Sequence, residues 1–252
     1  MLLPALVLLA GCDGPSSSSE EPSPTVSERS PEAPSASASE PSPSASDSSR
    51  PPKQSALPPY RSSIERIDAE LARRMEPSHD GSCPVALEAL RYLRMSFVDF
   101  DGTARLGEMV VHADVARDVV AVFAELYAQR FPIRRMRLVD EYDGDDDRSM
   151  AADNTSAYNC RRVAGTDRWS EHAYGRAIDV NPVQNPYVRD GSVAPPSGRP
   201  FADVDRSPGA SPPPGVVHAG SPVVRAFRAI GWSWGGSWTS SKDYQHFSLS
   251  GR

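Results

Sequence analysis

Ser170-Glu171-His172-Ala173-Tyr174-Gly175-Arg176-Ala177-Ile178-Asp179 is the stretch that says most about the fold, together with Asp243-Tyr244-Gln245-His246 near the C-terminus. Asp179 lies among apolar neighbours in residues 177–180, which is typical of a strand buried on both faces. Residues 244–247 alternate around His246 as a strand does. The span from His172 to Asp179 includes Gly175 and can pass from a turn into a strand. A carboxylate in a buried strand needs a partner, which a metal ion provides.

Two imidazoles and one carboxylate make a set of three zinc ligands, because zinc binds histidine nitrogen and carboxylate oxygen. Three protein ligands leave one position open for water, which is typical of a catalytic zinc site. We therefore predict that His172, Asp179 and His246 bind one zinc ion and that the protein is a hydrolase. Asp243 is a second carboxylate three residues before His246.

The N-terminal sequence predicts that the protein is exported from the cytoplasm. Residues 2–11 are almost wholly apolar, and this run is too short to span a bilayer. Leu9-Ala10-Gly11-Cys12 resembles a bacterial lipobox, so we predict a signal peptide at 1–11 and lipid on Cys12. The protein would then be extracytoplasmic, anchored to the bacterial membrane and facing the cell wall. No Lys or Arg precedes the apolar run, which leaves the true translation start open, and an ordinary cysteine after a chance apolar run is the alternative.

Composition divides the rest of the chain into two parts. Residues 13–59 have no aromatic residue and are rich in Ser, Pro, Ala and Glu, so residues 12–59 are predicted to be a lipidated cysteine and a disordered tether. Residues 60–252 are long enough for one domain with its own core. The net charge is −6 and the domain has no basic stripe, which argues against nucleic-acid binding.

Two cysteines remain once Cys12 is set aside. In an exported protein Cys83 and Cys160 are expected to form a disulfide, with two separate thiols as the alternative. The acidic cluster Asp143, Asp145, Asp146 and Asp147 lacks the spacing of an EF-hand and is interpreted as a solvated loop.

Local patterns predict an α+β domain: a small antiparallel sheet with flanking helices and the zinc site on the sheet. Asp101-Gly102 offers the turn of a hairpin between strands at 91–100 and 108–112. Ser62 and Ser63 are expected to cap a helix over 64–75, and Asp114 a helix to about 129. The remaining expectations are a strand at 135–139, an irregular insertion at 190–214, and a short helix at 221–230 followed by Gly231 as its C-cap.

The motifs SEHAYGRAIDVNP and WGGSWTSSKDYQHF resemble those of the VanY-like zinc peptidases, which comprise D-alanyl-D-alanine carboxypeptidases and L-alanyl-D-glutamate endopeptidases. The family signature is Ser-x-His-x-x-Gly-x-Ala-x-Asp followed by Asp-x-x-His. The resemblance implies zinc on His172, Asp179 and His246, with Asp243 as the catalytic base. It also implies peptidoglycan stem peptides as the substrate, cleaved at a bond that the sequence leaves open.

Family members often supply an arginine upstream of the first ligand to stabilise the oxyanion. Arg148 and Arg161 both qualify, and Arg161 is favoured because it lies closer to the signature. A rival function is a membrane-anchored lipoprotein that binds the cell wall or a metal on the same fold without catalysis. Asp243 discriminates between the two, because a degenerate site usually loses its base before its ligands. The sequence leaves the oligomeric state open.

Overall fold

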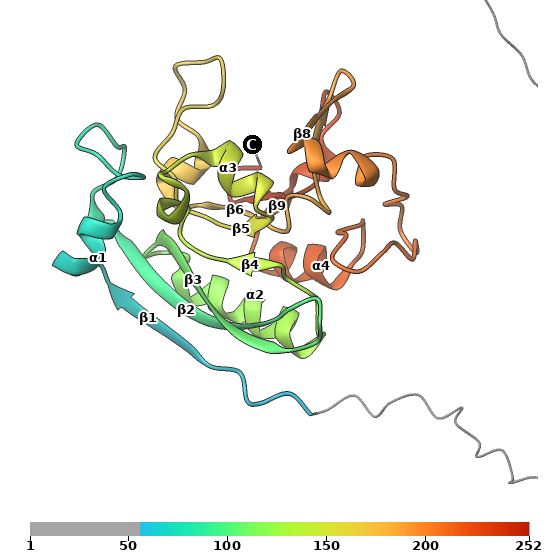
Figure 1. Ribbon diagram of the computed structural model, residues 1–252, viewed down its shortest axis with the longest axis horizontal. Helices are drawn as coiled ribbons and strands as arrows, with labels where there is room; N and C mark the ends of the chain where they lie inside the picture. The colour runs from blue at the N-terminus through green and yellow to red at the C-terminus, as the bar shows by residue number, and fades with distance from the viewer. Residues whose placement is uncertain (1–55, 252) are drawn as a thin grey trace, which may run out of the picture. The chain divides into compact units, whose positions relative to one another are not determined.

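The computed structural model describes residues 56–251 (Figure 1). The signal peptide predicted at 1–11, the lipid site at Cys12 and nearly all of the predicted tether lie outside this range. The described part is an α+β arrangement of small, mainly antiparallel sheets and short helices, as predicted. Among residues 56–251, no helix has the length and apolar character needed to cross a bilayer.

The largest sheet has the order β1-β2-β3, with β1 at Ser62–Arg66, β2 at Leu90–Val98 and β3 at Ala104–His112. The predicted hairpin is confirmed, and Leu90 pairs with His112 at its open end. Asp99 closes the other end, because its carboxylate accepts the N–H groups of Asp101 and Thr103. Gly102 supplies the positive φ of +77° that this turn requires.

Apolar residues alternate along β2 and β3, so both faces of the sheet are partly buried. Leu93, Met95 and Phe97 face helix α2, which spans Ala116–Ala128 and covers this side of the sheet (Figure 1). Leu90 and Val110 belong to a smaller core on the other side, with residues of α1 at Ala69–Arg74.

The helix predicted over 64–75 is wrong in its first half. Residues 62–66 form β1, because the edge of β2 offers hydrogen-bonding partners to them. The helix begins only after Asp68, whose carboxylate accepts the N–H groups of Glu70 and Leu71 at 3.1 and 2.8 Å. The predicted cap at Asp114 is also wrong, since α2 has no side-chain cap and Asp114 instead contacts His112 and Arg176.

Helix α4 at Pro222–Ala229 confirms the short helix predicted at 221–230. Ser221 caps it by accepting the N–H of Val224, and Gly231 follows with a φ of +83°. Phe227 of α4 stacks on Phe247 with ring centroids 4.1 Å apart, which joins the helix to the second sheet.

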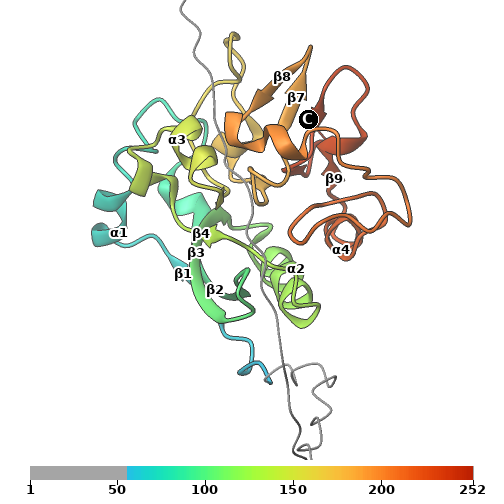
Figure 2. The ribbon, with the colours of Figure 1, turned by 45° about the vertical axis from the view of Figure 1, so that its right-hand side comes forward.

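The second sheet has the order β6-β11-β9, with β6 at Ala177–Asp179, β11 at His246–Ser248 and β9 at Ser233–Trp234. A third sheet has the order β10-β7-β8 and contains β10 at Lys242–Asp243, β7 at Tyr187–Arg189 and β8 at Ser192–Ala194. Strands β7 and β8 lie side by side in Figure 2. The irregular insertion predicted at 190–214 therefore begins with the turn and the second strand of a hairpin, and the turn residues Asp190 and Gly191 both have positive φ.

Short elements complete the domain. The predicted strand at 135–139 is only β4, Arg135–Met136, which pairs in parallel with β5, Asn154–Thr155. Helix α3 spans Asp146–Ala151 and lies between them in the sequence. The 3-10 helices are η1 at Leu87–Ala89, η2 at Val139–Tyr142, η3 at Glu171–Tyr174, η4 at Pro196–Phe201 and η5 at Gly235–Ser237.

Candidate metal centre and active site

His172 lies on the 3-10 helix η3, and the residues around it explain its position. Ser170 caps η3 by accepting the N–H of His172 at 3.3 Å. Gly175 ends η3 with a φ of +65°, and a Cβ atom there would lie 2.6 Å from the backbone nitrogen of His112. The serine and the glycine of the motif therefore fix the short helix against β3.

The His172 ring is oriented by its second nitrogen. Nδ1 lies 2.6 Å from the carbonyl oxygen of Ala157. A carbonyl oxygen only accepts hydrogen bonds, so Nδ1 carries a proton, and the neutral form of the ring keeps its lone pair on Nε2. This tautomer is the one that a metal ligand needs, and a backbone carbonyl is a common partner for a metal-binding imidazole.

Asp179 and His246 are placed by strand pairing. They lie directly opposite each other in the antiparallel register of β6 and β11. Asp179 also exchanges backbone hydrogen bonds with Ser156, at 2.9 and 3.1 Å, which holds the end of β6. Two segments 67 residues apart thus present their side chains to the same point.

The structure brings the three predicted ligands together. His172 Nε2 lies 3.3 Å from His246 Nδ1, and the two oxygens of Asp179 lie 3.2 Å from His172 Nε2 and 3.1 Å from His246 Nδ1. With zinc–ligand bonds of about 2.0–2.1 Å, the ligand atoms of a tetrahedral site lie about 3.3 Å apart. All three side chains are buried. The donor set, its spacing and the His172 tautomer therefore fit a zinc ion.

The electrostatics of Asp179 also fit a cation site. Burial would raise the pKa of this carboxyl group, but the charges and hydrogen bonds of His172 and His246 outweigh burial and hold the pKa well below its usual range. Asp179 is therefore an anion in a buried site, and such an anion requires positive charge beside it.

Asp243 ends β10 and pairs with Tyr187 across the third sheet. It is close enough to His246, Asp179 and His172 for their charges to act on its carboxyl group. Its Oδ1 is buried and has no hydrogen-bond partner among the described residues. Burial, reinforced by the negative charge of Asp179, raises the pKa of Asp243 to about 7 against the lowering influence of His246, His172 and Arg161. A carboxylate with a raised pKa and an unused buried oxygen is a candidate acid–base group.

The two candidate arginines differ in position. Arg161 is partly buried, lowers the pKa of Asp243 through its charge, and forms an ion pair of 2.8 Å with Asp146. Its Nε is buried without a hydrogen-bond partner among residues 56–251. Arg148 is more exposed and is paired with Asp143. The charge of Arg161 thus acts on Asp243, whereas no described contact connects Arg148 to the ligand cluster.

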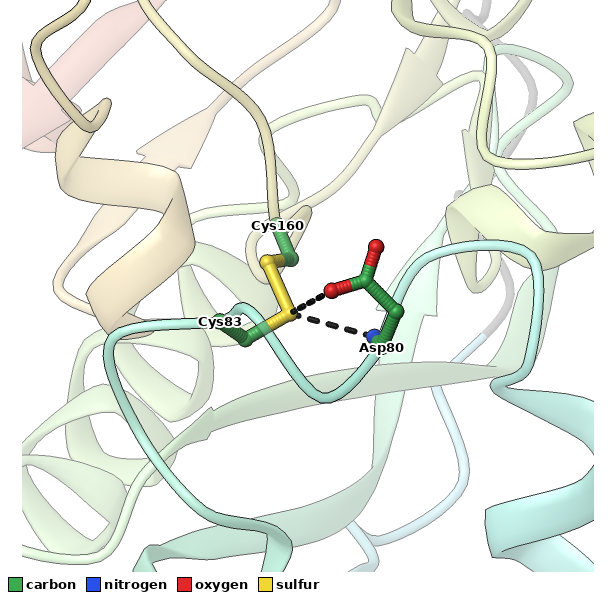
Figure 3. A group of neighbouring side chains, drawn as sticks. All are labelled: Asp80, Cys83 and Cys160. Carbon is green, nitrogen blue, oxygen red and sulfur yellow. Dashed lines mark hydrogen bonds between the residues drawn. A yellow bond between two sulfur atoms is a disulfide. The ribbon is translucent and has the colours of Figure 1, made fainter.

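A disulfide joins Cys83 to Cys160, as predicted, with 5.8 Å between the Cα atoms (Figure 3). Figure 3 shows Asp80 beside it, and the backbone N–H of Asp80 lies 3.1 Å from Cys83 Sγ. Both sulfur atoms are used in the S–S bond, so this trio is no metal site. The bridge fixes the residue that precedes Arg161.

One neighbour of Arg161 was not recognised in the sequence. Asp146, interpreted as part of a solvated loop, binds Arg161. Trp238 has its ring 5.5 Å from that of His246 and borders the ligand cluster, whereas Trp232 and Trp234 pack in the core. The motif Trp-Gly-Gly indicates close packing against Asp243, because a side chain at Gly235 would have no room there.

Residues 164–249, about a third of the chain, match the model of a family described as D-alanyl-D-alanine carboxypeptidase. The match includes His172, Asp179, Asp243 and His246, and it supports a peptidase at the level of the family. Neither a curated protein nor a solved structure matched the chain. The resemblance to the VanY-like peptidases is thus confirmed over residues 164–249, the segment that contains all three candidate metal ligands and Asp243.

Proposed function

We propose that the domain is a zinc-dependent peptidase that hydrolyses the stem peptides of bacterial peptidoglycan. The observation that carries this proposal is the spacing of His172, Asp179 and His246 in a buried site: the two ring nitrogens lie 3.3 Å apart, and each lies 3.1–3.2 Å from one oxygen of Asp179. The family match supports the class of substrate.

Each side chain of the site has a separate role in the proposed reaction. His172, Asp179 and His246 would hold zinc, which supplies a Lewis acid and lowers the pKa of water toward about 7 when it is bound. Asp243 accepts the proton of the attacking water and returns it to the leaving amine, a role suited to a carboxyl group whose pKa is raised to about 7. Arg161 stabilises the negative charge that develops on the carbonyl oxygen of the substrate.

Two scissile bonds are candidates. The family description favours release of the terminal D-alanine by a D,D-carboxypeptidase. The segments Asn154–Arg161 and Gly231–Gly236 resemble the endopeptidase branch and favour an internal cut between L-alanine and D-glutamate. Both reactions use the same attack of water on an amide.

Mass spectrometry of muropeptides incubated with the zinc-loaded protein tests the proposal. Loss of one D-alanine identifies a carboxypeptidase, and a cut nearer the sugar identifies an endopeptidase. Asp243→Ala should retain zinc and lose turnover by several orders of magnitude. Failure to cleave any wall preparation, with zinc bound, would favour the wall-binding or metal-binding lipoprotein instead.

We also propose that the protein works outside the cytoplasm, with lipid on Cys12 as its membrane anchor. The disulfide supports an oxidising compartment, because such bonds persist outside the reducing cytosol. Labelling with radioactive palmitate tests the anchor: wild-type protein should incorporate label, and Cys12→Ser should not.

A further inference from the structure

The first strand of the β7–β8 hairpin carries a side chain next to the proposed base. Asp243 and Tyr187 are directly opposite each other in the antiparallel pairing of β10 with β7. The side chains of such a pair lie on the same face of the sheet, with their Cβ atoms about 4.5–5.5 Å apart. Tyr244 follows Asp243 and points away from this face, and its ring stacks 4.1 Å from the guanidinium of Arg206. Tyr187 is thus the neighbour of Asp243 on the face that carries the proposed base.

Arg189 lies two residues after Tyr187 in β7, so it shares the face of Asp243. A hydrogen bond with Tyr187 is the main cause that raises the pKa of Arg189, and the charge of Asp190 adds to it. Figure 2 shows the hairpin projecting from the body of the domain, and 64% of the Arg189 side chain is exposed. A permanent positive charge therefore lies on this face, within reach of solvent.

The contacts of Arg189 within the chain leave it available to a ligand. Its ion pair with Asp190 spans 3.4 Å, and both side chains are mostly exposed. Exposed pairs of this kind contribute little, so a carboxylate that binds through two N–H groups can replace Asp190. The hydroxyl of Tyr187 accepts a hydrogen bond from the guanidinium and can still donate its own proton. The two side chains can therefore hold one carboxylate together.

The other cations near Asp243 have different positions. Lys242 precedes Asp243 in β10 and belongs to the opposite face, and its Nζ donates to the carbonyl oxygen of Trp238 at 2.5 Å. Arg161 forms an ion pair of 2.8 Å with Asp146 and is the group assigned above to the oxyanion. Within the third sheet, Arg189 is therefore the cation on the face of the proposed base.

Both candidate substrates carry a carboxylate next to the bond that is cut. In a D-alanyl-D-alanine terminus, the leaving nitrogen is attached to the carbon that bears the terminal carboxylate. In L-alanyl-γ-D-glutamate, it is attached to the carbon that bears the free α-carboxylate, because the chain continues through the γ-carboxyl group. Both carbons have the D configuration. The two reactions thus share one leaving group: a D-amino acid with a free α-carboxylate.

The proposed reaction puts this carboxylate close to Asp243. Asp243 returns a proton to the leaving nitrogen, and the carboxylate carbon is two bonds, about 2.5 Å, from that nitrogen. A carboxylate held near the anions Asp243 and Asp179 needs a positive charge beside it. The face that carries Asp243 provides one in Arg189.

We propose that Arg189 and Tyr187 bind the α-carboxylate of the leaving D-amino acid, so that the protein selects bonds followed by such a residue. This inference rests on the proposed peptidase function, because it takes Asp243 to act on the leaving amine. It assigns the same recognition element to the carboxypeptidase and the endopeptidase reaction.

Two pairs of peptides test the inference. The first pair is diacetyl-L-Lys-D-Ala-D-Ala and its C-terminal amide, and the second is N-acetyl-L-alanyl-D-glutamate γ-methylamide and its α-amide. Each acid has one carboxylate and each amide has none. Calorimetric titration of the zinc-free protein measures binding without turnover, and kcat/KM of the zinc-loaded protein measures cleavage. In at least one pair the acid should bind about tenfold or more tightly than the amide. The pair that shows the preference identifies the source of the carboxylate.

Variants assign the preference to the two side chains. Arg189→Gln should bring the affinities of acid and amide to about the same value. Tyr187→Phe keeps the ring, removes the hydroxyl and should lower the preference about fivefold. Arg117→Gln removes the same charge from an exposed position on α2, which packs on the first sheet, and should leave the preference intact. Arg189 is mostly exposed, so its replacement should leave the fold intact, which circular dichroism checks.

Equal affinity for acid and amide in both pairs would overturn the inference, as would a preference that survives in Arg189→Gln. A protein that prefers an acid but cleaves neither pair when loaded with zinc would contradict the proposed function and leave the carboxylate site standing. Cleavage of acid and amide with equal kcat/KM would do the reverse.

Discussion

Gly235 packs so closely against Asp243 that a Cβ atom at position 235 would lie 2.7 Å from the Asp243 carbonyl oxygen and 3.0 Å from the Asp243 Cβ. The same atom would lie 3.3 Å from the Cβ of His246. Backbone atoms cannot rotate away as a flexible side chain does, so a larger residue must displace the segment. Gly235 therefore sets the position of the proposed base and of one proposed ligand together.

Gly235→Ala should lower kcat by about 100-fold, because a displacement of about 1 Å in a catalytic group has an effect of this size. Steady-state hydrolysis of a stem peptide, with zinc content measured on the same sample, checks the prediction. Gly81→Ala is the matched control, since no heavy atom lies within 4 Å of a Cβ atom there. Equal kcat values for the two variants would show that this close packing does not position Asp243.

The two arginines give a paired prediction. Arg161→Ala should lower kcat/KM by about 100-fold or more, the usual effect of removing one group that stabilises the oxyanion, while zinc stays bound. Arg148→Ala removes an arginine whose described ion pair is with Asp143 and should change kcat/KM less than about twofold. A large loss in Arg148→Ala together with full activity in Arg161→Ala would reverse the assignment.

The parts of the fold that sequence patterns predicted are those with local causes. The β2–β3 hairpin follows from Asp101-Gly102 between two alternating segments, and α4 follows from Ser221, Pro222 and Gly231 at its ends. Asp179 and His246 could be placed on strands because each lies in a short apolar segment. The convergence of the metal ligands to 3.1–3.3 Å depends on how β6 pairs with β11, which only the family motif indicated.

Some of the errors have causes that lie far away in the sequence. Residues 64–75 have helical spacing, but the edge of β2 pairs with residues 62–66 instead. The β7–β8 hairpin had a local signal in Asp190-Gly191, which the surrounding proline and serine residues obscured. Arg206 is buried but carries no local sign of burial, because the four oxygens that accept its N–H groups come from three other segments of the chain.

Removal of the disulfide should destabilise the domain. Cys83 and Cys160 are 77 residues apart, and closing a loop of that length in the unfolded chain contributes about 4 kcal/mol on the chain-entropy account. We expect the double variant Cys83→Ser, Cys160→Ser to lose about 2–5 kcal/mol in urea unfolding, with zinc present in both samples. Wild-type protein treated with a reductant should lose a similar amount. An unchanged unfolding midpoint would show that the packing around Ser78 and Tyr158 is enough to hold this region in place without the disulfide.

Asp243→Asn should make the zinc-free protein more stable at pH 8, although it abolishes the proposed base. The wild-type carboxyl group is buried, Oδ1 lacks a hydrogen-bond partner in the described chain, and its pKa is raised from 3.8 to about 7. At pH values between these two pKa values, the folded state keeps a proton that the unfolded state has lost. Asp243 therefore opposes folding increasingly as the pH rises through this window. Above about pH 7 both states are charged, and the penalty stays constant. We expect the advantage of the asparagine variant to grow from about pH 4 to about pH 7 and then level off, with a total increase of about 3–5 kcal/mol, since each pKa unit corresponds to about 1.4 kcal/mol. Urea unfolding of both proteins in a chelator at pH 5 and pH 8 measures it, and a constant difference between the two pH values would show that Asp243 has an ordinary pKa.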